Sequence, residues 1–128
     1  MRRSPRKPFR LRQRAAIASL VLRLFLRWDL SIKEQRALLG LPGRTKLTQS
    51  EFLTQLQRMS DVRIRVGHLF AIYKNLATLF PENPEIAFAW PRSRNRGLRG
   101  KRPITLMAGR SDGLAKVRCY TDAMLANG

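Results

Sequence analysis

The sequence predicts an all-α protein, and three observations lead to this prediction. Apolar residues recur at helical spacing in several segments, and no segment shows the sustained apolar–polar alternation of a β-strand. Serine, threonine, asparagine and proline stand where these segments begin, and glycine or proline stands where they end. Apolar residues make up 44% of the 128 residues, which is enough for a hydrophobic core. We expect an N-terminal bundle of helix-turn-helix type, joined by a long helix to a small helical C-terminal domain.

The charge of the chain indicates an anionic partner. There are 26 Lys and Arg residues against 8 Asp and Glu residues, a net charge of +18. So large an excess repels itself, and it favours binding to nucleic acid, to an anionic membrane or to an acidic protein. The single cysteine, Cys119, excludes an internal disulfide and suits a reducing cytoplasm.

Catalysis has little support in the sequence. General acid–base chemistry needs paired titratable groups in a pocket, and the eight acidic residues are scattered along the chain. One histidine and one cysteine are too few for a zinc site built from this chain alone. We therefore expect a binding protein and not an enzyme, with no cofactor and no metal.

The N-terminal segment predicts a basic arm followed by a helix. Residues 1–14 hold seven basic residues, two prolines and no acid, which is typical of a flexible arm. We expect the arm to contact DNA phosphates through Arg2, Arg3, Arg6 and Lys7. One face of the helix carries Ile17, Leu20, Val21, Leu24, Phe25 and Trp28, and a second apolar strip carries Ala18, Leu22 and Leu26. So wide an apolar surface predicts burial by the rest of the fold or by another chain. Arg23 interrupts the apolar run, which is too short to span a bilayer, so we expect no membrane segment.

Two short helices follow and resemble a helix-turn-helix motif. Ser31 to Glu34 reads as a capping box, and the helix that it opens stops at Gly40. Residues 48–51 read as a second capping box, which opens a helix to about Met59. A tight glycine turn between two such helices is typical of DNA-binding proteins, in which the first residues of the second helix meet base edges. The residues that we expect at this place are Arg44, Thr45 and Lys46, and we expect Arg36 to touch a phosphate.

A longer helix and three shorter elements complete the chain. Apolar residues keep the helical period from Val62 to Phe80, and Pro81 ends this helix. Asn83 and Pro84 open a short helix that carries Trp90, Pro103 opens another that ends near Gly109, and residues 111–112 can cap the last helix. That last helix carries Leu114, Val117, Thr121 and Met124 on one side.

Between the short helices lies a basic loop. Trp90 precedes it, Pro103 ends it, and its basic residues are Arg92, Arg94, Arg96, Arg99, Lys101 and Arg102. Trp90 can anchor the loop in the core while the glycines permit its turns. The charged side chains then either bind a partner or only keep the loop solvated.

The chain resembles the Xre/MbcA/ParS family of antitoxins. RWDLSIKEQRALLGLP is similar to the opening of the family's Xre-like helix-turn-helix, and residues 68–125 resemble its C-terminal toxin-binding domain from end to end. The positions that carry the family pattern here are Leu69, Tyr73, Leu79, Phe80, Trp90, Asn95, Leu98, Gly100, Pro103, Val117 and Arg118. Pro91 and Arg94 depart from that pattern, in which leucine and proline are usual.

The resemblance implies two parts and a function. After the basic arm (1–14), which composition predicts, these parts are a helix-turn-helix domain (15–66) and a toxin-binding domain (67–128). It implies an antitoxin of a type II toxin–antitoxin pair, which blocks the active site of a RES-type, NAD-consuming toxin, forms a homodimer through its N-terminal domain and binds its own promoter. The residues expected on the toxin are Trp90, Arg94, Asn95, Arg96, Arg99, Gly100, Lys101, Arg102 and Pro103. The alternative is a basic DNA- or RNA-binding protein that has no toxin partner.

Overall fold

The computed structural model describes residues 11–109 and 112–128, and this part of the chain is all-α, as predicted. Its helices are α1 (Leu11–Arg27), α2 (Ile32–Leu39), α3 (Gln49–Arg58), α4 (Ser60–Leu79), α5 (Pro84–Ala89), α6 (Pro103–Met107) and α7 (Gly113–Asn127). Two short 3₁₀ turns, Trp90–Arg92 and Arg96–Leu98, lie between α5 and α6. The predicted DNA contacts Arg2, Arg3, Arg6 and Lys7 lie outside the described residues.

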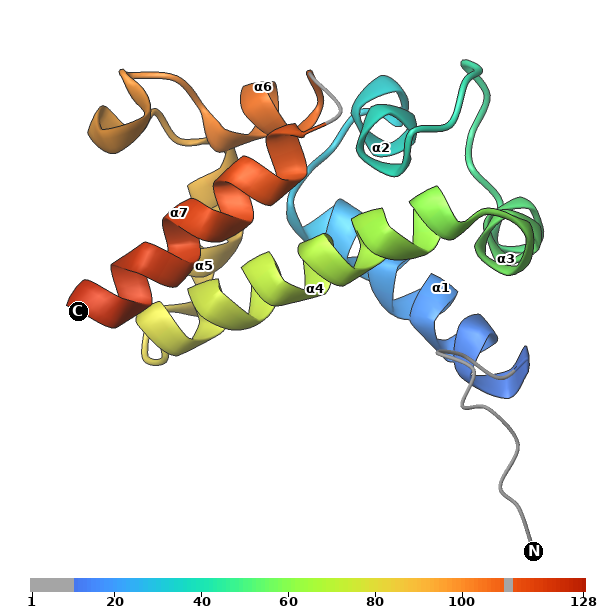
Figure 1. Ribbon diagram of the computed structural model, residues 1–128, viewed down its shortest axis with the longest axis horizontal. Coiled ribbons are helices and arrows are strands. Elements are labelled where there is room, and N and C mark those ends of the chain that lie inside the picture. The colour runs from blue at the N-terminus through green and yellow to red at the C-terminus, as the bar shows by residue number, and fades with distance from the viewer. Residues whose placement is uncertain (1–10, 110–111) are drawn as a thin grey trace, which may run out of the picture.

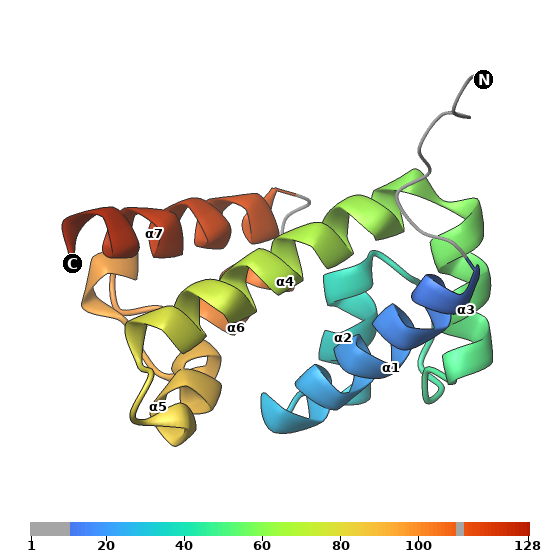
Figure 2. The same cartoon turned by 90° about the horizontal axis from the view of Figure 1, so that it is seen from below.

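The long helix α4 organises the molecule (Figure 1). Its N-terminal half packs against α2 and α3, and its C-terminal half packs against α5 and along the length of α7 (Figures 1 and 2). Helix α1 packs on α3, and α6 packs on α7. The expected boundary between residues 66 and 67 therefore falls inside one continuous helix.

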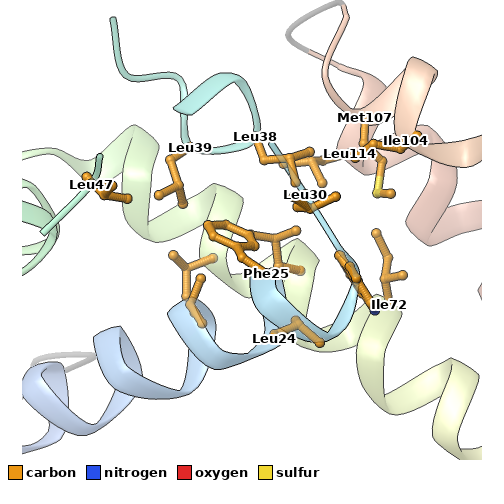
Figure 3. Packing of buried hydrophobic residues seen from close by; sticks show 14 of the residues in the cluster. Leu24, Phe25, Leu30, Leu38, Leu39, Leu47, Ile72, Ile104, Met107 and Leu114 are labelled. Carbon is orange, nitrogen blue, oxygen red and sulfur yellow. The ribbon is translucent and has the colours of Figure 1, made fainter. Parts of the chain in front are cut away.

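A single hydrophobic cluster runs through both halves of the structure. Phe25 and Leu38 enter it from the N-terminal half, and Met107 and Leu114 enter it from the C-terminal half (Figure 3). Each of these side chains is fully buried or nearly so. Burial of one such side chain contributes about 1.5–3 kcal/mol, so the cluster ties the two halves together.

Helix α1 differs from the sequence prediction in two ways. It begins at Leu11, so the last residues of the segment predicted as an arm are helical. Its apolar surface is also only partly covered. Ala18, Val21 and Phe25 are fully buried, whereas Leu20 remains 48% exposed and Leu26 remains 73% exposed.

One predicted capping box is complete and the other is half-formed. The backbone N–H of Ser31 donates to Oε1 of Glu34 at 2.9 Å, and the N–H of Glu34 donates to Oγ of Ser31 at 3.1 Å, as predicted. At α3, the N–H of Glu51 donates to Oγ1 of Thr48 at 3.1 Å. The prediction that the Glu51 carboxylate accepts a bond from the N–H of Thr48 was wrong, because that carboxylate accepts from Arg36 instead.

Asn75 is a buried polar residue at the centre of the α4–α7 contact. Its Nδ2 donates to Oγ1 of Thr121 at 2.9 Å and to Oδ1 of Asp122 at 2.7 Å. A buried amide needs such partners, because leaving it unpaired would cost about 1–3 kcal/mol. The bonds therefore hold α7, and with it the elements packed on α7, in one position along α4.

Candidate functional site

The basic loop, residues 90–103, is built on the core between α5 and α6 (orange in Figure 1). Trp90 is 8% exposed and its ring stacks on that of Tyr120 from α7, with centroids 6.3 Å apart. Pro91 and Pro103 are buried at the two ends of the loop. Trp90 therefore anchors the loop, as predicted from its size and position.

Asn95 closes the loop on itself. Its N–H donates to the carbonyl of Lys101 at 3.0 Å, and its own carbonyl accepts from the N–H of Gly100 at 2.9 Å. Its side-chain oxygen accepts from the N–H of Gly97 at 2.9 Å and from the hydroxyl of Tyr120 at 3.0 Å. The side-chain oxygen is thus committed to the protein itself, which gives Asn95 a structural role in shaping the loop.

Sequence reasoning expected the glycines to permit the turns of the loop, but it missed Tyr120, whose hydroxyl lies against Gly97. A Cβ placed on Gly97 would overlap the hydroxyl of Tyr120, so a larger residue there would have to displace the Tyr120 side chain. Gly100 has φ +76, the left-handed region that favours glycine. The glycines alone signalled a turn, but nothing local indicated that Tyr120, which lies on α7, closes it.

Most of the basic side chains of the loop are available to a partner. Arg96, Arg99, Lys101 and Arg102 are exposed, and within the described ranges none of them pairs with a carboxylate. Arg94 is also exposed, and its Nη1 donates to the carbonyl of Gly100 at 3.1 Å. The loop therefore holds an array of unneutralised cations on a backbone that is fixed by hydrogen bonds.

Arg92 differs from these residues, because it pairs with a carboxylate of the fold. Its Nη1 donates to Oε1 of Glu34 at 3.1 Å, which links the basic loop to α2. Burial acts to raise the pKa of Glu34, but hydrogen bonds from Ser31 and Arg92 and the charge of Arg92 outweigh it, so the pKa lies below 4.5. Glu34 is therefore ionised at neutral pH and ties Arg92 to the fold.

The prediction that Arg36 touches a phosphate was wrong. The side chain of Arg36 is only 4% exposed, and Glu51 binds it with both carboxylate oxygens, at 2.9 and 3.1 Å. Arg36 also donates to the carbonyls of Pro42 and Thr45, at 2.8 and 2.7 Å, and to Oγ1 of Thr45 at 3.2 Å. A guanidinium enclosed in this way holds the connection between α2 and α3 and cannot reach a nucleic acid.

The predicted start of a recognition helix was also wrong. Arg44, Thr45 and Lys46 are exposed, but they lie on residues 40–48, the non-helical connection between α2 and α3. This connection is longer than the three- to four-residue turn of a helix-turn-helix. Arg44 and Lys46 can still present charge to an anion, whereas the hydroxyl and carbonyl oxygens of Thr45 accept hydrogen bonds from Arg36.

His68 lies beside arginine side chains of α4 and α7. Its Nδ1 is 3.3 Å from Nη1 of Arg118 on α7. The pKa of His68 is lowered below 6.5, chiefly by burial and to a smaller extent by the positive charges of Arg118 and Arg65. Among the residues that the structure describes, no group of three or more His, Cys, Asp or Glu side chains could hold a metal ion.

No protein-family model matches this chain, and no curated protein or solved structure matches it either. Within residues 11–109 and 112–128, none of the helices has both the length and the apolar character that crossing a bilayer requires.

Proposed function

We propose that this protein is an antitoxin that binds and neutralises a RES-type, NAD-consuming toxin by blocking its active site. The observation that carries the proposal is the basic loop, in which exposed Arg and Lys side chains without carboxylate partners stand on a closed, hydrogen-bonded backbone. The resemblance of residues 68–125 to the toxin-binding domain of Xre/MbcA/ParS antitoxins supports the same function. In this proposal the protein acts in the cytoplasm and is not an enzyme.

The preformed loop suits tight binding to an acidic surface. A segment that is already ordered loses little conformational entropy when it binds, so more of the interaction energy remains as affinity. Exposed cations such as Arg102 accelerate encounter with an acidic rim, and salt screens this effect over about 8 Å at physiological strength. An arginine that becomes buried against a toxin carboxylate would instead slow dissociation.

We further propose that the N-terminal half dimerises and binds the promoter of its own operon. The exposed Arg44 and Lys46 support contacts with phosphates, which position a protein on DNA without reading its sequence. Arg36 has no part in this proposal, because its guanidinium is buried.

The test uses the full-length protein and the RES-type toxin that the proposal expects in the same operon. NAD consumption is measured against antitoxin concentration for the wild type and for a loop variant. The loop variant is Arg96→Ala/Arg99→Ala/Lys101→Ala/Arg102→Ala. A control variant removes the same charge from exposed positions on other elements, Arg12→Ala/Lys33→Ala/Arg58→Ala/Lys74→Ala.

We expect the loop variant to need at least tenfold more protein for half-inhibition and the control to stay within about twofold of the wild type, since each tenfold corresponds to about 1.4 kcal/mol. Equal inhibition by both variants would exclude the basic loop from the interface. A wild-type protein that fails to inhibit or to co-purify with the toxin would refute the antitoxin function and favour the nucleic-acid-binding alternative. That alternative predicts an affinity for nucleic acid that falls steeply as the salt concentration rises.

A further inference from the structure

An apolar groove lies between α1, α4 and α5, on a part of the surface that the basic loop does not occupy. Its volume is about 230 Å³. Figure 2 shows α5 and the C-terminal end of α1 on the same side of α4. The residues that the inference uses are Leu20, Arg23 and Arg27 of α1, Phe70 and Tyr73 of α4, and Phe88 of α5. We call this surface the Phe88 groove.

The floor of the Phe88 groove is made of large apolar side chains that the fold leaves uncovered. Leu20 is 48% exposed and Tyr73 is 41% exposed. The rings of Tyr73 and Phe88 stack with centroids 6.4 Å apart and an angle of 26° between their planes. Large apolar side chains gathered in one hollow, unlike single exposed ones, offer apolar area that a side chain of another molecule can cover.

Two arginines form the rim of the groove, and both lack a counter-charge. Arg23 and Arg27 are exposed, and in the part of the chain that the structure describes neither forms an ion pair. No Asp or Glu lines the groove. The guanidinium carbon of Arg27 lies 5.1 Å from the centre of the Phe88 ring, which orients its charge over the groove wall. An apolar floor beneath a cationic rim is complementary to an apolar side chain flanked by carboxylates.

We propose that the Phe88 groove docks an amphipathic segment of an acidic partner protein. The segment inserts a large apolar side chain against Tyr73 and Phe88, and its neighbouring carboxylates pair with Arg23 and Arg27. The groove is smaller than the roughly 300–1,000 Å³ of small-molecule sites, which fits one or two protein side chains better than a metabolite. The proposal rests only on the shape and charge of this groove, whose residues come from both halves of the chain. It therefore stands whether or not the protein is an antitoxin.

Charge and ring geometry disfavour two other occupants. A second copy of the chain docked groove to groove would bring Arg23 and Arg27 of the two rims together. Single-stranded nucleic acid binds by stacking bases on open aromatic faces. In the groove the rings of Tyr73 and Phe88 stack on each other and Arg27 lies over the Phe88 ring, so the two rings do not form separate platforms for successive bases.

The test begins with a phage library of random 16-residue peptides, selected on the full-length protein and counter-selected on the Tyr73→Ser variant. Tyr73→Ser leaves the net charge unchanged, and a second variant at an exposed position, Leu20→Ser, guards against a local folding effect. We expect the enriched peptides to carry Leu, Phe or Trp flanked by Asp or Glu. Their affinity, measured by fluorescence anisotropy, should fall at least tenfold with Tyr73→Ser, with Leu20→Ser and with Arg23→Ala/Arg27→Ala.

The matched control is Lys33→Ala/Arg58→Ala, which removes the same charge from exposed positions on α2 and α3 and should change peptide affinity by less than about twofold. Equal loss with this control would show general charge attraction and overturn the proposal. The absence of any peptide that distinguishes the wild type from Tyr73→Ser would overturn it as well. Two further outcomes would overturn the proposal, each with peptide binding unchanged by Tyr73→Ser. In the first, Tyr73→Ser abolishes self-association of the protein. In the second, Tyr73→Ser abolishes binding of a fluorescent ten-nucleotide oligothymidine.

Discussion

The hydroxyl of Tyr120 donates a hydrogen bond to the side-chain oxygen of Asn95 across 3.0 Å and so fastens the basic loop to α7. We predict that Tyr120→Phe lowers the free energy of unfolding by about 0.5–1.5 kcal/mol, the net contribution of one hydrogen bond. The loss stays small because the same oxygen of Asn95 also accepts from Gly97. Urea unfolding measures it. Tyr73→Phe is the control, because no hydrogen bond joins the Tyr73 hydroxyl to the described residues, and it should change stability by less than about 0.5 kcal/mol.

Two glycines should respond in opposite ways to a single methyl group. A Cβ at Gly113 would overlap the carbonyl oxygen of Leu106, where α7 begins against α6, whereas a Cβ at Gly67 in α4 meets nothing within 4 Å. Gly113→Ala should destabilise the protein by about 1–3 kcal/mol through overpacking. Gly67→Ala should stabilise it by about 0.5–1 kcal/mol, because alanine favours a helix interior. Thermal unfolding of the two variants checks the prediction, and a stabilised Gly113→Ala would contradict the close α6–α7 contact.

The pair Arg36–Glu51 should contribute more than an exposed ion pair. Removing one partner of a fully buried pair costs about 3–5 kcal/mol, and since Glu51 is 38% exposed we expect about 2 kcal/mol for Glu51→Ala. Asp112→Ala breaks the exposed pair with Lys116, where both side chains are more than half exposed, and should cost at most about 1 kcal/mol. A double-mutant cycle with Arg36→Met and Glu51→Ala measures the coupling. A coupling energy near zero would mean that the carbonyls of Pro42 and Thr45 hold Arg36 without help from Glu51.

His68 should make stability depend on pH just below neutrality. Its pKa is lowered in the folded protein, so below about pH 6.5 the unfolded chain binds the proton more readily. Stability should therefore fall as the pH falls from 6.5 through the folded-state pKa, and it should be flat above 6.5. His68 is the only histidine, so His68→Gln should remove most of this slope. Urea midpoints at pH 5.5, 6.5 and 7.5 test it, and an unchanged slope in the variant would assign the effect to another group.

Arg92→Ala should raise the pKa of Glu34 towards 4.5, because it removes a hydrogen bond and a positive charge from that carboxylate. A carboxyl group whose pKa is lowered by folding stabilises the fold at pH values above its pKa in the unfolded chain. This contribution disappears as the pH falls through its pKa in the folded protein. The variant should lose at most about 1 kcal/mol at pH 7, since both side chains are partly exposed, and progressively less as the pH falls through the folded-state pKa of Glu34. Carboxyl chemical shifts in an NMR titration follow Glu34 directly. An unshifted titration curve would show that Ser31 alone lowers the pKa.

Local chemistry was enough to predict the helices. The Ser31–Glu34 capping box, the left-handed Gly40 and the proline at the start of α6 need only their immediate neighbours, so the sequence marks them directly. The exposure of the basic loop and the anchoring of Trp90 also followed from composition, because a run of charges seldom enters a core and a tryptophan seldom stays out of one.

Contacts between distant residues decided the rest. Arg36 looked like any surface arginine, and only the approach of Glu51 and of the 40–48 backbone made burial of its charge tolerable. The shape of the basic loop depends on Tyr120, and the Phe88 groove exists only where α1, α4 and α5 converge. Helix starts and stops are set by hydrogen bonds a few residues apart, which a sequence displays. Whether a charge is buried, a loop closed or an apolar face left open is set by packing between segments, and that is decided only when the chain has folded.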